Sequence, residues 1–313
     1  ITPELTVTFL NAGHILGSAM IEFKYNGKKI IFTGDLGNSP SPLLPDTDKV
    51  TDADYLIMES VYGDRNHESR EDRRRLLAET IQDNHKRKGT LIIPTFSLER
   101  SQELLFELDA LLAGDRIPVM PIFFDSPLAI RLTEVFKEYK TYFNENAQKA
   151  ISPGKYLFDF PGLHNTLRSE ESKMIANVPN PKIVIAGSGM STGGRIVHHE
   201  RHYLPDPNNT ILLTGYQSLG TPGRLIFEGL KKVRISGEDV SVRAHVAMIS
   251  GYSGHKDSDG LLNFVEDMED TVKKVFVVMG EPKSSMFLVQ KLRDNLGIDA
   301  YAPETGESVT LPL

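Results

Sequence analysis

The chain of 313 residues contains no cysteine and no tryptophan. The absence of cysteine excludes disulfide bonds and thiolate zinc sites, and it is typical of proteins kept in a reducing compartment. Any bound metal must therefore be held by His, Asp or Glu. On this basis we expect the protein to be cytoplasmic.

Long hydrophobic runs are also missing. No apolar stretch approaches the roughly 20 residues that cross a bilayer, and the N-terminus has no signal-peptide pattern, so we expect no membrane partner. The net charge of −7 argues against a protein that coats nucleic acid non-specifically. It leaves room for a local basic groove, because net charge governs steering rather than the fold or the site.

The apolar pattern predicts an α/β protein in three segments. Short strands come first, then strands and helices alternate as in a parallel, Rossmann-like unit, and short strands return near the C-terminus. We therefore expect a β-rich domain made of residues 1–63 and 241–313, interrupted by an inserted domain at 64–240. The predicted strands are 5–10, 19–25, 29–33, 53–60, 90–94, 117–124, 182–186, 210–214, 233–235, 240–249 and 275–278; the predicted helices are 69–88, 99–112, 127–148, 193–203, 259–269 and 285–295.

Two polar side chains near the N-terminus each end an apolar stretch beside glycine. His14 stands in Gly-His-Ile-Leu-Gly-Ser and Asp35 in Thr-Gly-Asp-Leu-Gly. Taken singly, a histidine in this setting is commonly a structural hydrogen-bonding residue, and an aspartate beside glycine commonly caps a turn. Together, their matched placement at strand ends indicates a pair of metal ligands.

A second pair occupies similar positions. Glu59 ends the strand at 53–60, and a carboxylate at the carboxyl end of a strand is a frequent active-site position in α/β sheets. His255 follows an apolar strand in Ser-Gly-Tyr-Ser-Gly-His, where small neighbours allow close approach of a substrate and imidazole can shuttle a proton. The alternatives are a helix-capping acid and a surface-loop histidine.

Two loops have the composition of anion-binding turns. The glycine- and hydroxyl-rich segment 186–195 joins a strand to a helix, although it matches neither a Walker nor a dinucleotide-binding motif. The turn at 95–100 could equally be an ordinary N-cap with surface charges. The candidate substrate-binding residues are Ser97, Arg100, Ser188, Gly189, Ser191, Thr192, Gly193 and Arg195.

The remaining histidines carry weaker signals. His198, His199 and His202 share a predicted helix, but the glutamate of a His-Glu-x-x-His zinc motif is missing, so we interpret them as structural or substrate-facing. We interpret His245 as structural. Residues at the surface are expected to be His67, His85 and His164, because their neighbours are polar.

In order and approximate spacing, the motifs around His14, Asp35, Glu59, Gly187–Gly194 and His255 resemble those of the metallo-β-lactamase-fold nucleases with an inserted β-CASP domain, of the cleavage-and-polyadenylation-factor type. The resemblance extends over nearly the whole chain. It implies an incomplete metallo-β-lactamase αββα sandwich with an inserted Rossmann-like β-CASP domain. The implied activity is that of a zinc-dependent RNA phosphodiesterase with two zinc ions, acting on single-stranded RNA held between the domains near the candidate phosphate contacts. A homodimer is a further expected assembly.

The resemblance also implies individual roles. The residue matching His14 binds one zinc and the residue matching Asp35 bridges both, while Glu59 orients His255, the general acid for the leaving 3′-oxygen. Paired divalent ions roughly 3.5–4 Å apart stabilise the charge of such a displacement.

Two departures from the family pattern stand against full activity. The chain contains no His-x-His-x-Asp-His motif, which in the family lies upstream of the residue matching His14, so we expect a chain truncated at its N-terminus, without a complete dinuclear site and with little or no hydrolysis. In addition, Met279 in Val-Val-Met-Gly-Glu takes the place of a zinc-binding histidine, and a thioether is a poor zinc ligand beside hard oxygen donors.

Whether the chain is an enzyme therefore stays open at the level of sequence. Met279 favours a non-catalytic RNA-binding or scaffold subunit that has lost metal ligands. His14, Asp35, Glu59 and His255 favour the nuclease. A related DNA nuclease is a third interpretation.

Overall fold

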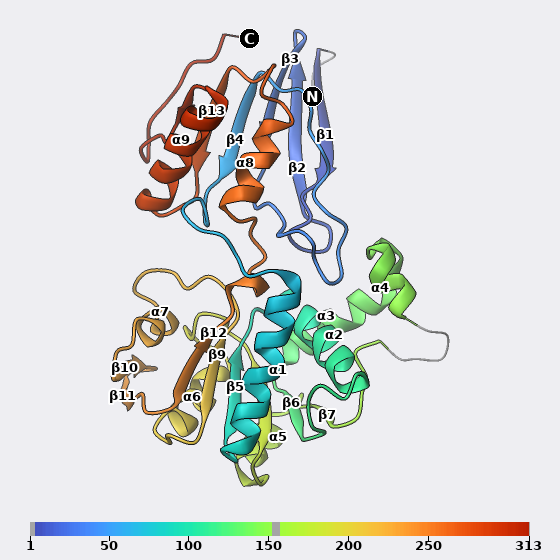
Figure 1. The fold of residues 1–313 in the computed structure, drawn as a ribbon, viewed down its shortest axis with the longest axis vertical. Coiled ribbons are helices and arrows are strands. Elements are labelled where there is room, and N and C mark those ends of the chain that lie inside the picture. The colour runs from blue at the N-terminus through green and yellow to red at the C-terminus, as the bar shows by residue number, and fades with distance from the viewer. Residues whose placement is uncertain (1–3, 152–156, 313) are drawn as a thin grey trace. The chain divides into compact units, whose positions relative to one another are not determined.

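The computed structural model describes residues 4–151 and 157–312 and divides into two compact units (Figure 1). The first unit joins Ile1–His67 to Gly254–Leu313, and the second is Glu68–Ser253. The first unit is thus discontinuous in sequence and contains His14, Asp35, Glu59 and His255. Each unit is built around its own six-stranded sheet.

The first unit contains a mixed sheet in the order β1-β2-β3-β4-β13-β14. The first three strands are antiparallel, and β3, β4, β13 and β14 run parallel. Asn26 and Gly27, with φ of 47° and 75°, form the predicted hairpin turn between β2 and β3. The strands are β1 Leu5–Asn11, β2 Ala19–Tyr25, β3 Lys28–Phe32, β4 Tyr55–Glu59, β13 Lys274–Val278 and β14 Ala300–Tyr301.

Two amphipathic helices pack on this sheet, α8 (Ser258–Glu266) and α9 (Pro282–Leu296) (Figure 1). Their apolar faces meet alternate residues of the strands in one cluster. Its fully buried members include Met20, Ile31, Leu56, Met58, Leu261, Val265, Val275, Leu288 and Leu292. Burying each such side chain contributes about 1.5–3 kcal/mol, so this core fixes the strand ends that carry the polar residues.

The second unit has an all-parallel sheet in the order β12-β9-β5-β8-β6-β7. Every residue of β5, β8 and β9 is buried, as expected for parallel strands covered on both faces. The predicted Rossmann-like architecture is confirmed. The strands are β5 Thr90–Pro94, β6 Ile122–Phe124, β7 Leu163–Asn165, β8 Lys182–Ala186, β9 Thr210–Leu213 and β12 His245–Met248, with a separate hairpin of β10 Lys232–Ile235 and β11 Glu238–Ser241.

Helices and helical turns connect and cover these strands (Figure 1). The first helix begins after Ser69, whose side chain accepts a hydrogen bond from the Asp72 N–H. The helices are α1 Arg70–Lys86, α2 Arg100–Ala113, α3 Pro127–Glu138, α4 Glu145–Ala150, α5 Ser169–Met174, α6 Ile196–Tyr203 and α7 Pro222–Phe227; the 3₁₀ turns are Lys140–Tyr142, Ile175–Asn177 and Ser250–Tyr252.

Three predicted elements were wrong in extent. The strand predicted at 117–124 is confined to Ile122–Phe124, because Pro118 and Pro121 cannot donate to a ladder. The helix predicted at 127–148 breaks into α3, a 3₁₀ turn and α4, which is capped by Asn144. The strand predicted at 240–249 is two strands, β11 and β12, in different sheets. Short elements such as β7, α5, α7 and β14 were missed.

Candidate metal centre

His14 is placed by close backbone packing between two loops of the first unit. The Gly37 N–H donates to the Ala12 carbonyl oxygen at 2.8 Å, and a Cβ on Gly37 would lie 2.1 Å from the Gly13 carbonyl oxygen. Only glycine fits there. His14 Nδ1 lies 3.0 Å from the Gly254 carbonyl oxygen, which can only accept, so Nδ1 carries the proton and Nε2 keeps its lone pair.

Asp35 follows β3 and faces that lone pair. Its Oδ2 lies 3.7 Å from His14 Nε2. Its Oδ1 is buried and has no hydrogen-bond partner among the described residues. Burying an unpartnered carboxylate oxygen is unfavourable, and a cation at this position would remove the penalty.

Glu59 and His255 form a directed pair beside these two residues. Glu59 is 0% exposed at the end of β4 and accepts the Leu36 N–H at 2.5 Å. His255 Nδ1 lies 3.0 and 3.1 Å from the two Glu59 carboxylate oxygens. The carboxylate thereby fixes the imidazole tautomer and leaves Nε2 for chemistry. The His14 and His255 ring centroids are 4.6 Å apart.

The donor set suits a metal ion. His14, Asp35 and His255 each offer one ligand atom, and these atoms lie within 4.8 Å of one another. Imidazole nitrogen and carboxylate oxygen are usual zinc ligands, and three protein ligands suffice for one zinc. Within residues 4–151 and 157–312, no other group of three or more His, Asp or Glu side chains converges closely enough to hold a metal ion.

Met279 stands where the resemblance places a further ligand. It follows Val278, the residue of β13 paired with Glu59, so it lies at the strand edge that carries the centre. Its side chain is 60% exposed and its φ is 64°, an unusual value outside glycine. A thioether adds no hard donor to this edge.

Lys256 supplies a positive charge next to His255. Burial lowers the pKa of its amino group, and the carboxylates of Asp46, Asp257 and Glu59 act in the opposite direction. The centre is therefore a concentration of carboxylates with one partly buried ammonium group beside it.

One residue that supports the centre was missed. His67 is half-buried rather than at the surface, and its Nε2 donates to the His255 carbonyl oxygen at 3.0 Å. Its ring packs against Tyr62 with centroids 4.3 Å apart, and its N–H donates to Asp257. The polar neighbours Asn66 and Glu68 conceal this role in the sequence.

The candidate phosphate contacts belong to the second unit and have their own partners. Arg100 is buried and forms an ion pair with Glu103. The Ser97 hydroxyl lies 3.4 Å from that of Ser126. The spacing of Arg100 and Glu103 on one helix is the signal that could have predicted their pairing.

The glycine-rich loop is tightly folded on itself. The Ser188 N–H donates to the Gly193 carbonyl oxygen at 3.0 Å, and the Ser188 and Thr192 hydroxyls are 3.0 Å apart. Ser191 is buried and donates to Glu200. Gly189 lies against Phe96, where a Cβ would come within 2.8 Å of the ring. Thr192 is exposed.

Arg195 and His199 converge on Asp125, a buried carboxylate at the end of β6. Arg195 donates to Asp125 at 2.6 Å and to the carbonyl oxygens of Thr166 and Leu167, and His199 Nε2 lies 2.7 Å from Asp125. Burial acts to raise the Asp125 pKa, but hydrogen bonds from His199, Ser172, Thr166 and Arg195 outweigh it and lower the pKa to about 2. His198 and His202 are exposed on the same helix.

A discontinuous α/β unit with a histidine–carboxylate centre, carrying an inserted parallel-sheet unit, defines the class. Two family models match, the Beta-Casp domain over residues 101–226 and the Zn-dependent metallo-hydrolase RNA specificity domain over residues 239–303. The chain belongs to the β-CASP family of metallo-β-lactamase-fold nucleases. The second family model indicates metal dependence.

Several relatives align with almost all of the chain. Ribonuclease TTHA0252 of Thermus thermophilus is 36% identical over 97% of the chain and 69% of its own length. An RNase J-like protein of Methanocaldococcus jannaschii is 31% identical over 98% of the chain and 71% of its own length. The transcription termination factor FttA of Pyrococcus horikoshii is 32% identical over 99% of the chain, which spans about half (49%) of that relative.

A solved structure supports the fold alone. A protein of unknown function from Enterococcus faecalis matches 99% of this chain and 65% of its own with a TM-score of 0.52 and 13% identity. Among the described residues, none of the helices combines the length and the apolar character needed to span a membrane.

Proposed function

We propose that the protein is a metal-dependent ribonuclease that acts on single-stranded RNA in RNA processing or decay. The observation that supports this most strongly is the convergence of His14, Asp35 and the Glu59-oriented His255 in one unit, with Asp35 Oδ1 unpartnered among the described residues. Relatives named as ribonucleases share this family.

We also propose the domain organisation predicted from sequence, a metallo-β-lactamase part interrupted by a β-CASP part, with the boundaries predicted after residues 63 and 240 moved to those of the two units. The division into a discontinuous and a continuous unit supports it, with junctions after His67 and Ser253.

In this proposal zinc is held by His14 through Nε2 and by the Asp35 carboxylate. When bound, zinc supplies Lewis-acid stabilisation of negative charge on a phosphodiester. His14 and Asp35 supply donors for one ion, and the two ions expected from the resemblance require donors beyond these residues.

His255 acts on the leaving group. Glu59 accepts a hydrogen bond from the Nδ1–H and holds the ring, so that Nε2, when protonated, can donate to the departing oxygen. The backbone around this ring is held at two points. His67 donates to the His255 carbonyl oxygen, and the His14 side chain donates to the Gly254 carbonyl oxygen.

For the RNA strand we propose direct phosphate contacts from the glycine-rich loop, namely from the exposed Thr192 and the half-buried Ser188 and Gly193, with Ser97 nearby. Gly189 is buried against Phe96 and contributes the close packing of the loop. Ser191, Arg195 and Arg100 are engaged by Glu200, Asp125 and Glu103. In this proposal Ser191, Arg195 and Arg100 hold the loops in place and affect RNA binding only indirectly.

A second candidate is a non-catalytic RNA-binding subunit, and Met279 is the observation that favours it. The test is cleavage of end-labelled single-stranded RNA by the complete protein and by its Asp35→Asn variant, with RNA affinity measured in parallel. The nuclease proposal expects zinc-dependent cleavage that falls by at least about 10²-fold in the variant while affinity is retained. RNA binding with no cleavage by either protein would favour the scaffold.

A further inference from the structure

The histidines of α6 belong to a pocket that the proposed reaction does not use. A pocket of about 350 Å³ lies between α5 and α6 in the second unit. Ser172 and Lys173 line it from α5, and Arg195, His198, His199 and His202 line it from α6 and its first turn. Pockets of this size bind small ligands in many proteins.

The titratable side chains that line this pocket are histidine, lysine, arginine and tyrosine, with no carboxylate among the described lining residues. Asp125 lies beneath it, and its two oxygens are already bonded by Arg195, His199, Ser172 and Thr166. These hydrogen bonds compensate the negative charge of Asp125 and fix the positions of the Arg195 and His199 side chains.

Three donors at the pocket remain available. Lys173, His198 and His202 form no ion pair within the described part of the chain, and both histidines are exposed. Two glutamates precede Lys173 on α5, but neither lines the pocket, and Glu171 is bonded to Arg168. His198 and His202 are four residues apart, so they project from one face of α6.

This donor set selects an anion rather than a metal. Among the described residues, three potential metal-ligand atoms converge at His14, Asp35 and His255, and not at this pocket. A cluster of N–H donors without a carboxylate matches the oxygens of a phosphate group, which accept charge-assisted hydrogen bonds.

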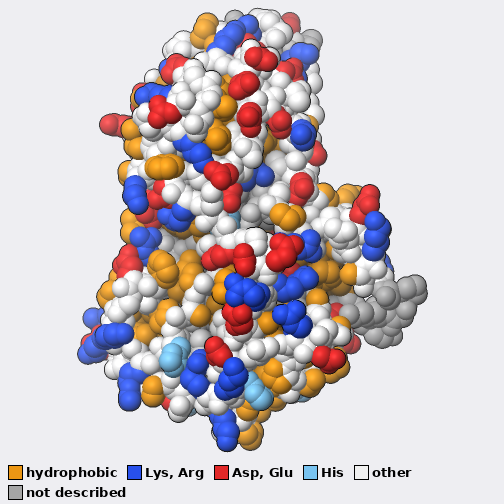
Figure 2. All heavy atoms as spheres, viewed as in Figure 1, with side chains coloured by type: hydrophobic (Ala, Val, Ile, Leu, Met, Phe, Trp, Pro, Cys, Tyr) orange, Lys and Arg blue, Asp and Glu red, His pale blue; other side chains and the backbone are white. Residues whose placement is uncertain are grey.

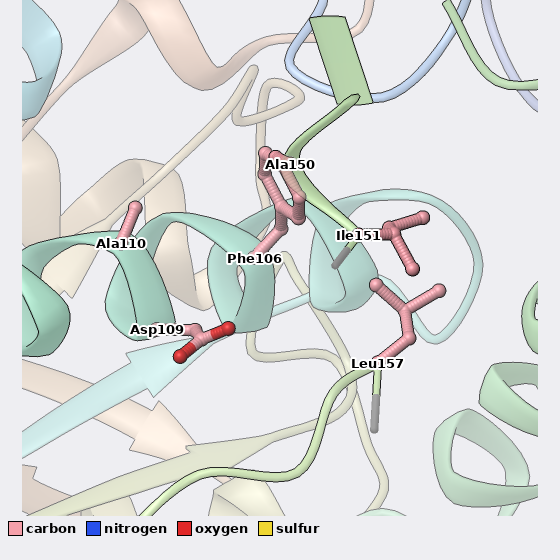
Figure 3. Close-up of a pocket in the computed structure, with 6 residues that line it drawn as sticks. All are labelled: Phe106, Asp109, Ala110, Ala150, Ile151 and Leu157. Atoms are coloured by element: carbon pink, nitrogen blue, oxygen red, sulfur yellow. The ribbon is translucent and has the colours of Figure 1, made fainter. Parts of the chain in front are cut away.

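Two other pockets among the described residues of the second unit lack this character. The arginines lining a pocket of about 200 Å³ over α1 are interleaved with acids, as Figure 2 shows, and Arg74 and Arg75 pair with Glu107 and Glu79. A pocket of about 50 Å³ beside α2 is mainly apolar, with Asp109 as its charged residue (Figure 3). Its size and its carboxylate make it unsuitable for a phosphate.

We propose that the groove between α5 and α6 binds a phosphate group of an RNA strand, with Lys173, His198 and His202 as its donors and Arg195 at its floor. The assignment to RNA rests on the proposed function, whereas phosphate binding itself rests on the groove. All residues of this groove belong to the second unit, whereas the residues of the metal centre belong to the first.

The test titrates the purified chain with inorganic phosphate and with adenosine 5′-monophosphate, while the histidine ring signals are followed by NMR. Affinity for a single-stranded RNA oligonucleotide is then measured at several salt concentrations. The variants are Lys173→Ala and the double variant His198→Gln/His202→Gln. Matched controls are Lys149→Ala and His164→Gln, exposed residues of the same unit that do not line the groove.

The proposal expects phosphate to shift the His198 and His202 signals and to leave that of His164 in place. It expects the groove variants to lose roughly tenfold in RNA affinity and to reduce the salt slope by about 0.7 per lost contact, while the controls bind as the parent does. Zinc content should be unchanged in every variant, so failure at the metal centre would be visible separately.

Two outcomes would overturn parts of the proposal. Unmoved His198 and His202 signals at tens of millimolar phosphate would exclude the groove as a phosphate site. Signals that move with adenosine 5′-monophosphate, together with unchanged RNA affinity in the groove variants, would replace the RNA strand with a free nucleotide as the ligand.

Discussion

At the scale of single residues, the site is defined by which nitrogen of each histidine is already engaged. His14 and His255 both use Nδ1 for a structural hydrogen bond, to the Gly254 carbonyl and to Glu59, so both present Nε2. The sequence predicted His14, Asp35, Glu59 and His255 because each of these residues ends a strand or follows one. It could not predict the tautomers or His67, because a contact with a distant carbonyl leaves no local pattern.

His255 can be tested as an acid rather than a ligand. In the complete protein, His255→Ala should slow RNA cleavage by about 10²–10⁴-fold, because the leaving oxygen loses its proton donor. Zinc content, measured by elemental analysis, should be retained through His14 and Asp35. Loss of zinc together with cleavage would instead make His255 a metal ligand.

Glu200 predicts a pH dependence of stability. Burial raises its pKa to about 8, and the Ser191 hydrogen bond offsets part of that shift. The unfolded chain releases this proton near the ordinary glutamate value of about 4.3, so the folded protein binds more protons between about pH 4.3 and 8. The contribution of Glu200 to the free energy of unfolding is therefore fully present below about pH 4.3 and is lost as pH rises to about 8.

Glu200→Gln should remove that loss. In urea titrations, the free energy of unfolding of Glu200→Gln relative to that of the parent should rise by about 1–3 kcal/mol between pH 5 and pH 8.5. Glu79→Gln, at an exposed ion-paired position, serves as the control. A constant difference between parent and Glu200→Gln across this range would contradict the buried, protonated state.

At the scale of elements, glycine contacts and strand ends decide where the functional loops lie. The alternation of strands and helices predicted the parallel sheet, since buried apolar runs identify its central strands. The limits of 117–124 and 127–148 failed where prolines or a cap at Asn144 interrupt an otherwise continuous pattern. The pairing of Arg195 was also hidden, because its partner Asp125 comes close only in three dimensions, whereas the spacing of Arg100 and Glu103 on one helix was a local signal.

Gly37→Ala tests the loop packing beneath His14. The added Cβ would lie 2.1 Å from the Gly13 carbonyl oxygen, so the two backbones must separate. We expect a loss of about 1–3 kcal/mol in unfolding free energy and weaker zinc binding. Gly215→Ala, with open space around the new Cβ, is the matched control. Equal stability of the two variants would show that the contact is dispensable.

At the scale of the molecule, two units with separate cores divide the proposed work. The first carries the metal centre on its mixed sheet, and the second carries the glycine-rich loop and the α5–α6 groove on its parallel sheet. The sequence predicted this insertion from the change in pattern along the chain. It assigned residues 241–248 to the outer domain, whereas β12 (His245–Met248) pairs with β9 in the sheet of the second unit, a long-range pairing without a local signal.

The central claim is that His14 and Asp35 hold a zinc ion beside the proposed general acid His255, and zinc stoichiometry tests it most directly. The purified chain, dialysed against micromolar zinc, should retain about one zinc by elemental analysis, and His14→Ala and Asp35→Asn should each abolish this binding. His164→Gln should bind as the parent does. Zinc content that is absent from the parent, or unchanged in both ligand variants, would contradict the account.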